Sequence, residues 1–162
     1  MIRRAAVLKP PTPLRFDAGR PSVFLAGSIE MGKAEDWQGR LMRALGDLDI
    51  TILNPRRDDW DASWRQSIDD PQFRGQVEWE LDAQARASVI AMYFAPETQA
   101  PITLLELGLF AATGKLVVCC PDGYWRKGNV EVVSARHRIE MLPDLDALAA
   151  ACRARLLAAQ PA

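Results

Sequence analysis

Short runs of apolar residues alternate along the chain with segments that repeat apolar positions at helical spacing. Such unbroken apolar runs are typical of strands buried on both faces of a sheet. We expect strands at 22–27, 50–53, 88–94, 115–120 and 138–142. We expect helices between and after them, at 35–48, 72–87, 102–113, 129–136 and 143–157. Strands that alternate with helices in this way predict a parallel sheet with helices on both of its faces.

The predicted fold is therefore α/β: a flavodoxin-like or Rossmann-like three-layer sandwich with a five-stranded parallel sheet. The alternation does not fix the order of the strands, and we prefer the flavodoxin-like order 2-1-3-4-5. Residues 1–20 are expected to form an extended N-terminal arm, because prolines at 10, 11 and 13 disrupt regular structure. Residues 21–160 are expected to form a single domain, which the length of 162 residues allows.

Composition narrows the possible functions. With 49% hydrophobic and 25% charged residues, the chain has the composition of a soluble globular protein. A net charge of −1 argues against broad binding of nucleic acid polymers or anionic membranes. No apolar segment approaches the roughly 20 residues of a membrane span, and the N-terminal one is too short for a signal peptide. We therefore expect a cytoplasmic protein.

The cysteines and the single histidine point to no metal or redox chemistry. Cys119 and Cys120 are adjacent in an expected buried strand, and the three cysteines form neither a disulfide framework nor a metal set. His137 has no obvious partner in sequence for a catalytic triad. We expect reduced thiols, no metal and no cofactor.

Two of the expected strands end in residues suited to ligands, since ligands of parallel α/β sheets bind beyond the carboxyl ends of the strands. Gly27 would let a ligand approach the backbone, and Ser28 offers a hydroxyl and an amide, although a tight turn explains both. After the second strand, Arg56 can bind a phosphate or carboxylate, and Trp60 can stack on a base. A self-neutralising surface loop is equally consistent with the second segment.

Glu106 is the most informative carboxylate. It follows the third expected strand, near the start of a helix, and has leucine neighbours that would exclude water. A nucleophile or base is one interpretation. Thr103 and Glu106 also fit a capping box, with Thr103 as the N-cap, and on the pattern alone this is the stronger interpretation. In either case, the helix dipole would keep a first-turn carboxylate ionised.

Several motifs in order resemble one known family. They are Phe24–Ser28 (FLAGS), Leu53–Arg56 (LNPR), Gln76–Leu81 (QVEWEL), Pro101–Gly108 (PITLLELG) and Gly114-Lys115. Each motif is short, but the ordered set, between about Ser22 and Leu142, resembles the nucleoside 2-deoxyribosyltransferase-like family. The resemblance also implies the flavodoxin-like sheet.

The resemblance implies a covalent mechanism on a small nucleoside or nucleotide. In that family the glutamate matching Glu106 attacks C1′ of a 2′-deoxynucleoside and expels the base, and another base or water then takes the sugar. Glu80 is the best match for the acid that protonates the leaving base, with Asp82 as the alternative. Asn129 matches an asparagine that a neighbouring subunit supplies, which implies a homodimer or higher homo-oligomer. The expected substrate-binding positions are Phe24, Gly27, Ser28, Asn54, Arg56, Trp60, Thr103 and Asn129.

Two departures from the family pattern bear on activity. Established transferases carry an acid shortly before the catalytic glutamate, where this chain has Gln99-Ala100-Pro101, and often a tyrosine where it has Phe24. Arg56 and Arg57 make a nucleoside monophosphate an alternative to a nucleoside as the substrate. Cleavage or transfer at the N-glycosidic bond is the first hypothesis. A nucleotide-binding or sensing module without turnover is the second, and an interaction domain in which Glu106 is only a cap is the third.

Overall fold

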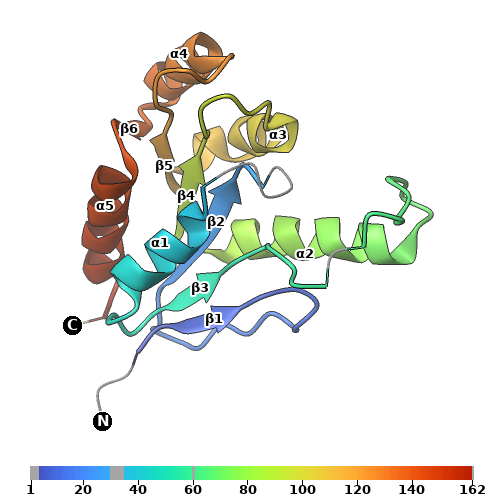
Figure 1. Ribbon diagram of the computed structural model, residues 1–162. Coiled ribbons are helices and arrows are strands. Elements are labelled where there is room, and N and C mark those ends of the chain that lie inside the picture. The colour runs from blue at the N-terminus through green and yellow to red at the C-terminus, as the bar shows by residue number, and fades with distance from the viewer. Residues whose placement is uncertain (1–3, 30–34, 60, 162) are drawn as a thin grey trace.

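The computed structural model describes residues 4–29, 35–59 and 61–161. Within these residues, six strands form one parallel sheet in the order β1-β3-β2-β4-β5-β6 (Figure 1). The strands are β1 (Ala6–Leu8), β2 (Ser22–Gly27), β3 (Thr51–Leu53), β4 (Val89–Tyr93), β5 (Leu116–Cys119) and β6 (Glu140–Leu142). The helices are α1 (Trp37–Leu45), α2 (Pro71–Arg86), α3 (Pro101–Phe110), α4 (Lys127–His137) and α5 (Leu145–Ala158), with a 3₁₀ turn, η1 (Ala111–Thr113), after α3.

The predicted strand order is confirmed, whereas the predicted number of strands is one too low. Without β1, the sheet reads β3-β2-β4-β5-β6, which is the order 2-1-3-4-5 of the expected strands. The additional strand comes from the N-terminal segment and pairs with β3, from Ala6 opposite Thr51 to Leu8 opposite Leu53. Three residues are too few to show a period in the sequence, and β1 forms because β3 offers an open parallel edge.

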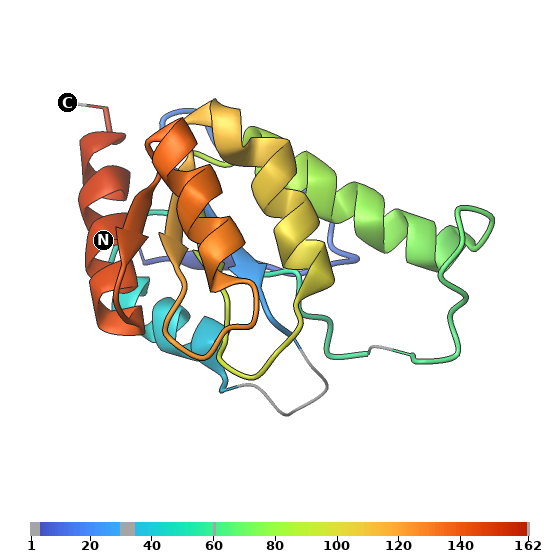
Figure 2. The ribbon, with the colours of Figure 1, turned by 90° about the horizontal axis from the view of Figure 1, so that it is seen from above.

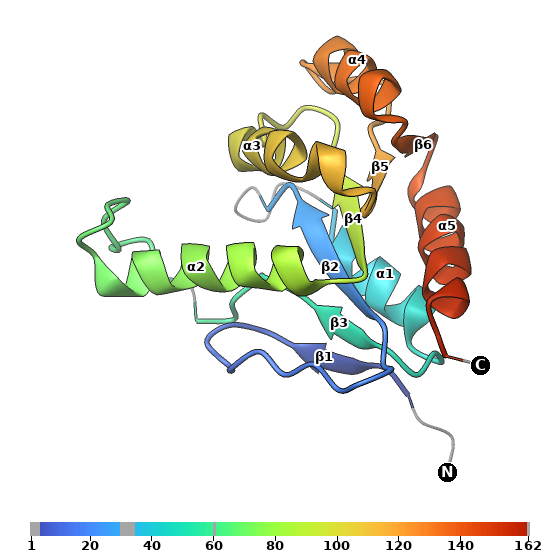
Figure 3. The ribbon, with the colours of Figure 1, turned by 180° about the vertical axis from the view of Figure 1, so that it is seen from behind.

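The helices cover the sheet in two layers, which confirms the three-layer architecture. On one face α1 and α5 pack together, and Trp37, Leu41, Leu148 and Cys152 are wholly buried there. On the other face lie α2, α3 and α4, which bury Trp79, Leu107 and Val130 against the sheet. Figure 3 shows α2 and α3 next to each other on this second face.

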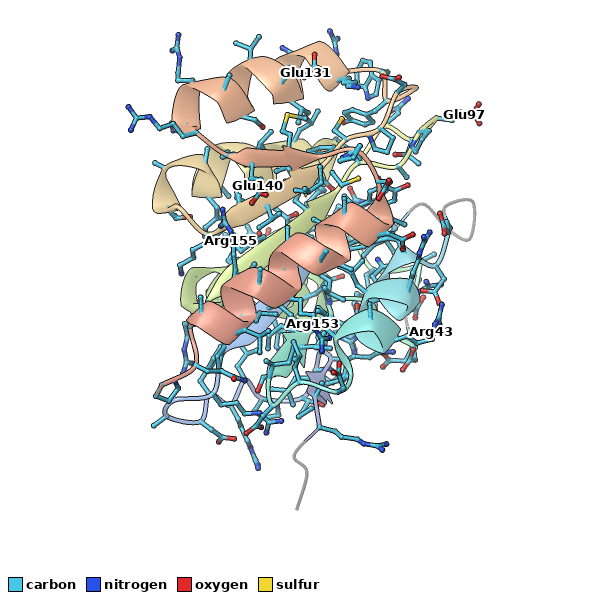
Figure 4. All side chains as sticks on the ribbon, turned by 90° about the vertical axis from the view of Figure 1, so that its left-hand side faces the viewer. Arg43, Glu97, Glu131, Glu140, Arg153 and Arg155 are labelled. Carbon is cyan, nitrogen blue, oxygen red and sulfur yellow. The ribbon has the colours of Figure 1, made fainter. Side chains whose placement is uncertain are left out.

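The side of the molecule that carries α5 has charged residues that pair with one another. Arg153 of α5 forms two hydrogen bonds with the carboxylate of Asp47, and Arg155 lies 3.8 Å from Glu140 of β6 (Figure 4). Exposed pairs of this kind contribute little to stability and leave few unpaired charges. The polar residues that form the candidate site lie on the opposite face of the sheet, which α2 and α3 cover.

The segment before α2 reaches away from the sheet (Figure 2). It ends in a regular helix start, because the Asp70 carboxylate accepts hydrogen bonds from the backbone N–H groups of Gln72 and Phe73, and Pro71 occupies the first helical position. Trp60 lies outside the described residues. None of the helices in the described ranges has the length and apolar character needed to cross a membrane.

Candidate active site

Glu106 is not part of a capping box, so that expectation was wrong. Helix α3 begins at Pro101, and its N-cap is Ala100, in the left-handed region with φ 44° and ψ 53°. Proline suits the first helical position because its fixed φ is helical and the N–H it lacks would have no partner there. Thr103 is therefore inside the first turn, and Glu106 lies in the second turn, beyond the reach of capping.

Glu106 is buried between α3 and α2. Its side chain is 7% exposed, and its Oε1 accepts a hydrogen bond of 2.8 Å from Nε2 of Gln84 on α2. Burial and the nearby charge of Glu80 raise the pKa of Glu106 to about 8, against the opposing effect of the Gln84 hydrogen bond. The expectation that the helix dipole keeps this carboxylate ionised therefore fails, because Glu106 lies beyond the first turn, where the dipole acts, and desolvation favours its protonated form.

Glu80 faces the same region from α2. Gln76, Glu80 and Gln84 follow one another at four-residue spacing and so share one side of the helix. Oε1 of Glu80 accepts a 2.6 Å hydrogen bond from Nε2 of Gln76, which also donates to the carbonyl of Pro55 after β3. Burial raises the pKa of Glu80 to about 6, although the Gln76 hydrogen bond lowers it.

Glu80 and Glu106 therefore form a coupled carboxyl pair. Burial raises both pKa values, to about 6 for Glu80 and to about 8 for Glu106, and the charge of Glu80 raises the pKa of Glu106 further. Glu80 is thus the stronger acid of the two, and Glu106 keeps its proton to a higher pH. Enzymes separate an acid from a base or nucleophile by such differences in environment.

Two of the expected binding residues serve packing in this structure. Phe24 is wholly buried in the core beneath α2 and α3. A Cβ atom at Gly27 would lie 2.5 Å from the carbonyl oxygen of Tyr93 and 2.6 Å from Cζ2 of Trp37, so only glycine fits between them. Close packing of the chain itself therefore accounts for Gly27.

Ser28 connects two loops at the carboxyl edge of the sheet. Its Oγ accepts a hydrogen bond from the Ala95 N–H and lies 2.8 Å from Oγ1 of Thr98. The Thr98 hydroxyl donates to the Ala95 carbonyl, so the Ser28 hydroxyl donates to Thr98. The exit of β2 is thus fixed to the loop that leads from β4 into α3.

The segment after β3 holds one arginine firmly and the other loosely. Asn54 is buried, and its Oδ1 accepts a hydrogen bond from the backbone N–H of Arg56. The Arg57 guanidinium binds both carboxylate oxygens of Asp59 and stacks over Trp64 at 4.7 Å. Arg56 is half-exposed and contacts Asp36 only at 3.4 Å. Arg57 therefore shapes the loop, whereas Arg56 is more readily available to a ligand.

Asp82 and Asn129 lie apart from the carboxyl pair. Both are exposed, Asp82 on α2 and Asn129 near the start of α4.

A hollow of about 350 Å³ lies away from the carboxyl pair, beyond the ends of β5 and β6. It includes neither member of the pair and is lined by Cys120, Pro121, Asp122, Lys127, Glu131, Met141, Leu142 and Pro143.

Gln76 and Gln84 form hydrogen bonds with the carboxyl pair, and the sequence analysis did not identify either of them as a site residue. The four-residue spacing from Gln76 through Glu80 to Gln84 is visible in the sequence and places all three on one helix side. Attention to the acids at 78, 80 and 82 alone obscures this pattern, because those three positions point in different directions.

Comparison with known proteins bears out the resemblance. Residues 20–124 match the family described as nucleoside 2-deoxyribosyltransferase like, a range that covers well over half of the chain and includes Glu80 and Glu106. Among curated proteins, no match was found. The chain therefore belongs to the nucleoside 2-deoxyribosyltransferase-like family.

Proposed function

We propose that this protein is an enzyme that cleaves the N-glycosidic bond of 2′-deoxynucleosides or their monophosphates and passes the sugar to another base or to water. The carboxyl pair carries this proposal. Glu106 of α3 is close enough to Glu80 of α2 for the charge of Glu80 to raise its pKa, and the two carboxyls differ in pKa, about 8 against about 6. Displacement of a base through a covalent intermediate needs one carboxylate nucleophile and one acid, which is the protonation state such a pair provides.

The first step is a displacement at C1′ of the sugar. A carboxylate oxygen of Glu106 forms a bond to C1′ while the C1′–N bond breaks, and its electron pair remains on the base. Glu80 supplies a proton to the departing base. In the second step a base or water attacks C1′, the bond to Glu106 breaks, and the proton of the incoming group returns to Glu80. Glu106 leaves the cycle as a carboxylate.

This sequence requires a proton to move when substrate binds. In the free protein the higher pKa belongs to Glu106, so the shared proton resides mainly there. Before the attack, Glu106 passes this proton to the ionised Glu80, which then carries it to the departing base. The positive charge that grows on the sugar as the C1′–N bond lengthens stabilises the ionised Glu106.

Arg56 supports a monophosphate as one form of the substrate. Its guanidinium is half-exposed and its contact with Asp36 is long, at 3.4 Å, so a phosphate can replace the aspartate as partner. Arg57 is unsuited to this role, because both oxygens of Asp59 already occupy its guanidinium.

A second copy of the chain is proposed to complete the site. Helix α3 exposes Ile102, Leu105 and Leu109 by 59%, 59% and 54%, an apolar stripe on the helix that carries Glu106. Covering this stripe with another subunit would bring an exposed Asn129 close to a site that is not its own. Co-refolding inactive Glu106→Ala and Asn129→Ala variants should then restore about one quarter of the wild-type activity in a dimer, through mixed dimers with one intact site. No restoration would refute sharing between subunits.

The direct test of the proposal is product formation. Purified protein is incubated with each deoxynucleoside or its monophosphate and a second base, and free and exchanged bases are separated by chromatography. Intact mass spectrometry should detect a deoxyribosyl adduct on the wild type and none on Glu106→Ala. Glu78→Gln, a change at an exposed acid of α2 that pairs with Arg74, is the matched control and should keep full activity.

Two results would contradict the proposed enzymatic activity. If the wild type and Glu106→Ala are equally inert with every substrate, the proposal fails. Saturable binding of a nucleotide by calorimetry, with neither product nor adduct, would instead support the sensing module.

A further inference from the structure

Gln84 has no part in the steps proposed above, yet its contacts with the carboxyl pair are specific. The side chain is wholly buried, and its Nε2 is the hydrogen-bond donor to Oε1 of Glu106 at 2.8 Å. The same nitrogen donates to the backbone carbonyl of Glu80 at 3.3 Å. Both amide hydrogens are therefore used, one by the Glu106 carboxyl and one by the backbone of α2.

These two contacts fix the orientation of the amide. Rotating the amide by 180° would place its oxygen against the Glu80 carbonyl oxygen and, when Glu106 is ionised, against its carboxylate oxygen, and both hydrogen bonds would then be lost. The favoured orientation leaves Oε1 of Gln84 buried without a hydrogen-bond partner among the described residues. A buried acceptor without a donor is unfavourable, so part of what the two hydrogen bonds contribute is lost again at this oxygen.

We propose that Gln84 is a positioning residue for Glu106, whose amide group holds one carboxylate oxygen in place and favours the ionised form that attacks the sugar. The inference about mechanism rests on the proposed function, whereas the effect on the carboxyl group does not. A hydrogen bond from a neutral donor is stronger to a carboxylate than to a carboxylic acid. Gln84 therefore opposes the desolvation that favours protonation.

Among the described neighbours of Glu106, Gln84 is the residue that favours its ionised form. From α2, Glu80 is the charged group that acts on Glu106, and its effect favours protonation. The side chains that pack in this core from β2 and β4 are apolar, including Phe24, Ile90 and Met92. From α4, Val130 and Val133 belong to the same core. Among the groups that act on the Glu106 carboxyl, the Gln84 hydrogen bond is the one that lowers its pKa.

The test is a carboxyl titration of Gln84→Met, which keeps the side-chain volume and removes the donor. Glutamate δ-carbons are labelled with ¹³C, and the Glu106 signal is assigned by its loss in Glu106→Gln. In Gln84→Met the measured pKa of Glu106 should rise by about one unit, which corresponds to the loss of one charge-assisted hydrogen bond. Gln72→Met, at an exposed position of the same helix, is the control and should leave the titration unchanged.

The pH profile of activity, together with the titration, distinguishes positioning from a structural role. With turnover established, Gln84→Met should lower kcat about tenfold on the acidic side of its pH profile, with KM unchanged and the acidic limb moved upward by about one unit. Resistance to urea does not distinguish the two roles by itself, because the substitution removes one orphaned oxygen together with two hydrogen bonds. The titration and the pH profile do: a purely structural glutamine predicts lower stability with no movement of either.

The outcomes separate this inference from the proposed function. A titration that shifts in a protein without turnover would support the role of Gln84 and refute the enzyme. Turnover with an unmoved Glu106 titration in folded Gln84→Met would refute the role of Gln84 alone. Gln84→Leu is the second variant, and loss of the fold in both would show that Gln84 is structural and overturn the proposal.

Discussion

Replacing Glu106 with glutamine should make the protein more stable, and more so as the pH rises. Glutamine keeps the shape of the side chain and can still accept the hydrogen bond from Gln84, but it cannot ionise. In the wild type, burial raises the pKa of Glu106 from 4.5 to about 8. The folded protein therefore binds a proton that the unfolded chain has already released in this range, and its stability falls as the pH increases.

The pKa difference sets the size of the effect. Below pH 4.5 the carboxyl is protonated in both states, and its contribution to stability is fully present. That contribution decreases from pH 4.5 upward and is lost once the pH passes about 8. At 1.36 kcal/mol per pKa unit, the full difference is about 5 kcal/mol. Solvent that enters between α2 and α3 when Glu106 ionises screens part of this, so we expect a gain of about 2–5 kcal/mol for Glu106→Gln at pH 9.

Urea unfolding of the wild type and Glu106→Gln at pH 5 and pH 9 measures this gain. The free energies of unfolding should differ little at pH 5 and diverge by the stated amount at pH 9. Glu78→Gln removes an exposed carboxylate from α2 and should run parallel to the wild type at both values, apart from its surface pair with Arg74. If Glu106→Gln also runs parallel to the wild type, or is less stable at pH 9, the carboxyl is not held in a desolvated site and the reasoning is refuted.

Three further changes test the surroundings of the pair. Ala100→Gly should stabilise the protein by about 0.5–1 kcal/mol in urea, since Ala100 has φ 44°. Ala135→Gly, at an exposed position in the last turn of α4, should instead destabilise it; equal signs would contradict the strain argument. Ser28→Ala should destabilise by about 1–3 kcal/mol because the buried Ala95 N–H loses its acceptor, and a raised KM at unchanged stability would instead assign Ser28 to substrate binding. Arg56→Ala should raise KM about tenfold for a deoxynucleoside monophosphate and leave KM for the nucleoside unchanged. An equal effect on both substrates would show that Arg56 does not bind phosphate.

The sheet could be predicted because its strands carry the signal themselves. The runs at Ser22–Gly27, Val89–Tyr93 and Leu116–Cys119 are apolar on both faces, as a central parallel sheet requires, and every expected helix is present with ends within three residues of expectation. Strand β1 could not be predicted in this way. Ala6–Leu8 is partly exposed, and its pairing depends on the free edge of β3, which is distant in the sequence.

The N-cap of α3 was predicted wrongly because two local signals compete there. Thr103 with Glu106 fits a capping box, and Pro101 fits a first helical position. The choice depends on Ala100, whose left-handed conformation and burial are set by the loop from β4. A residue without a polar side chain gives no sign of such a conformation. With the helix starting earlier, Glu106 moves out of the first turn and into the contact with α2.

The carboxyl pair could be anticipated in part, and its energetics explain why the rest needed the structure. Spacing alone places Gln76, Glu80 and Gln84 on one side of α2, but the burial of that side depends on how α3 packs against it. Once the helices meet, two carboxyls and two amide oxygens without partners, those of Gln76 and Gln84, are removed from water. Apolar residues at these positions would pack without that penalty, as replacements of buried polar groups do elsewhere. A polar stripe that opposes stability is difficult to explain by folding alone, and the proposed mechanism accounts for it, because that mechanism needs one carboxylate and one acid at the same place.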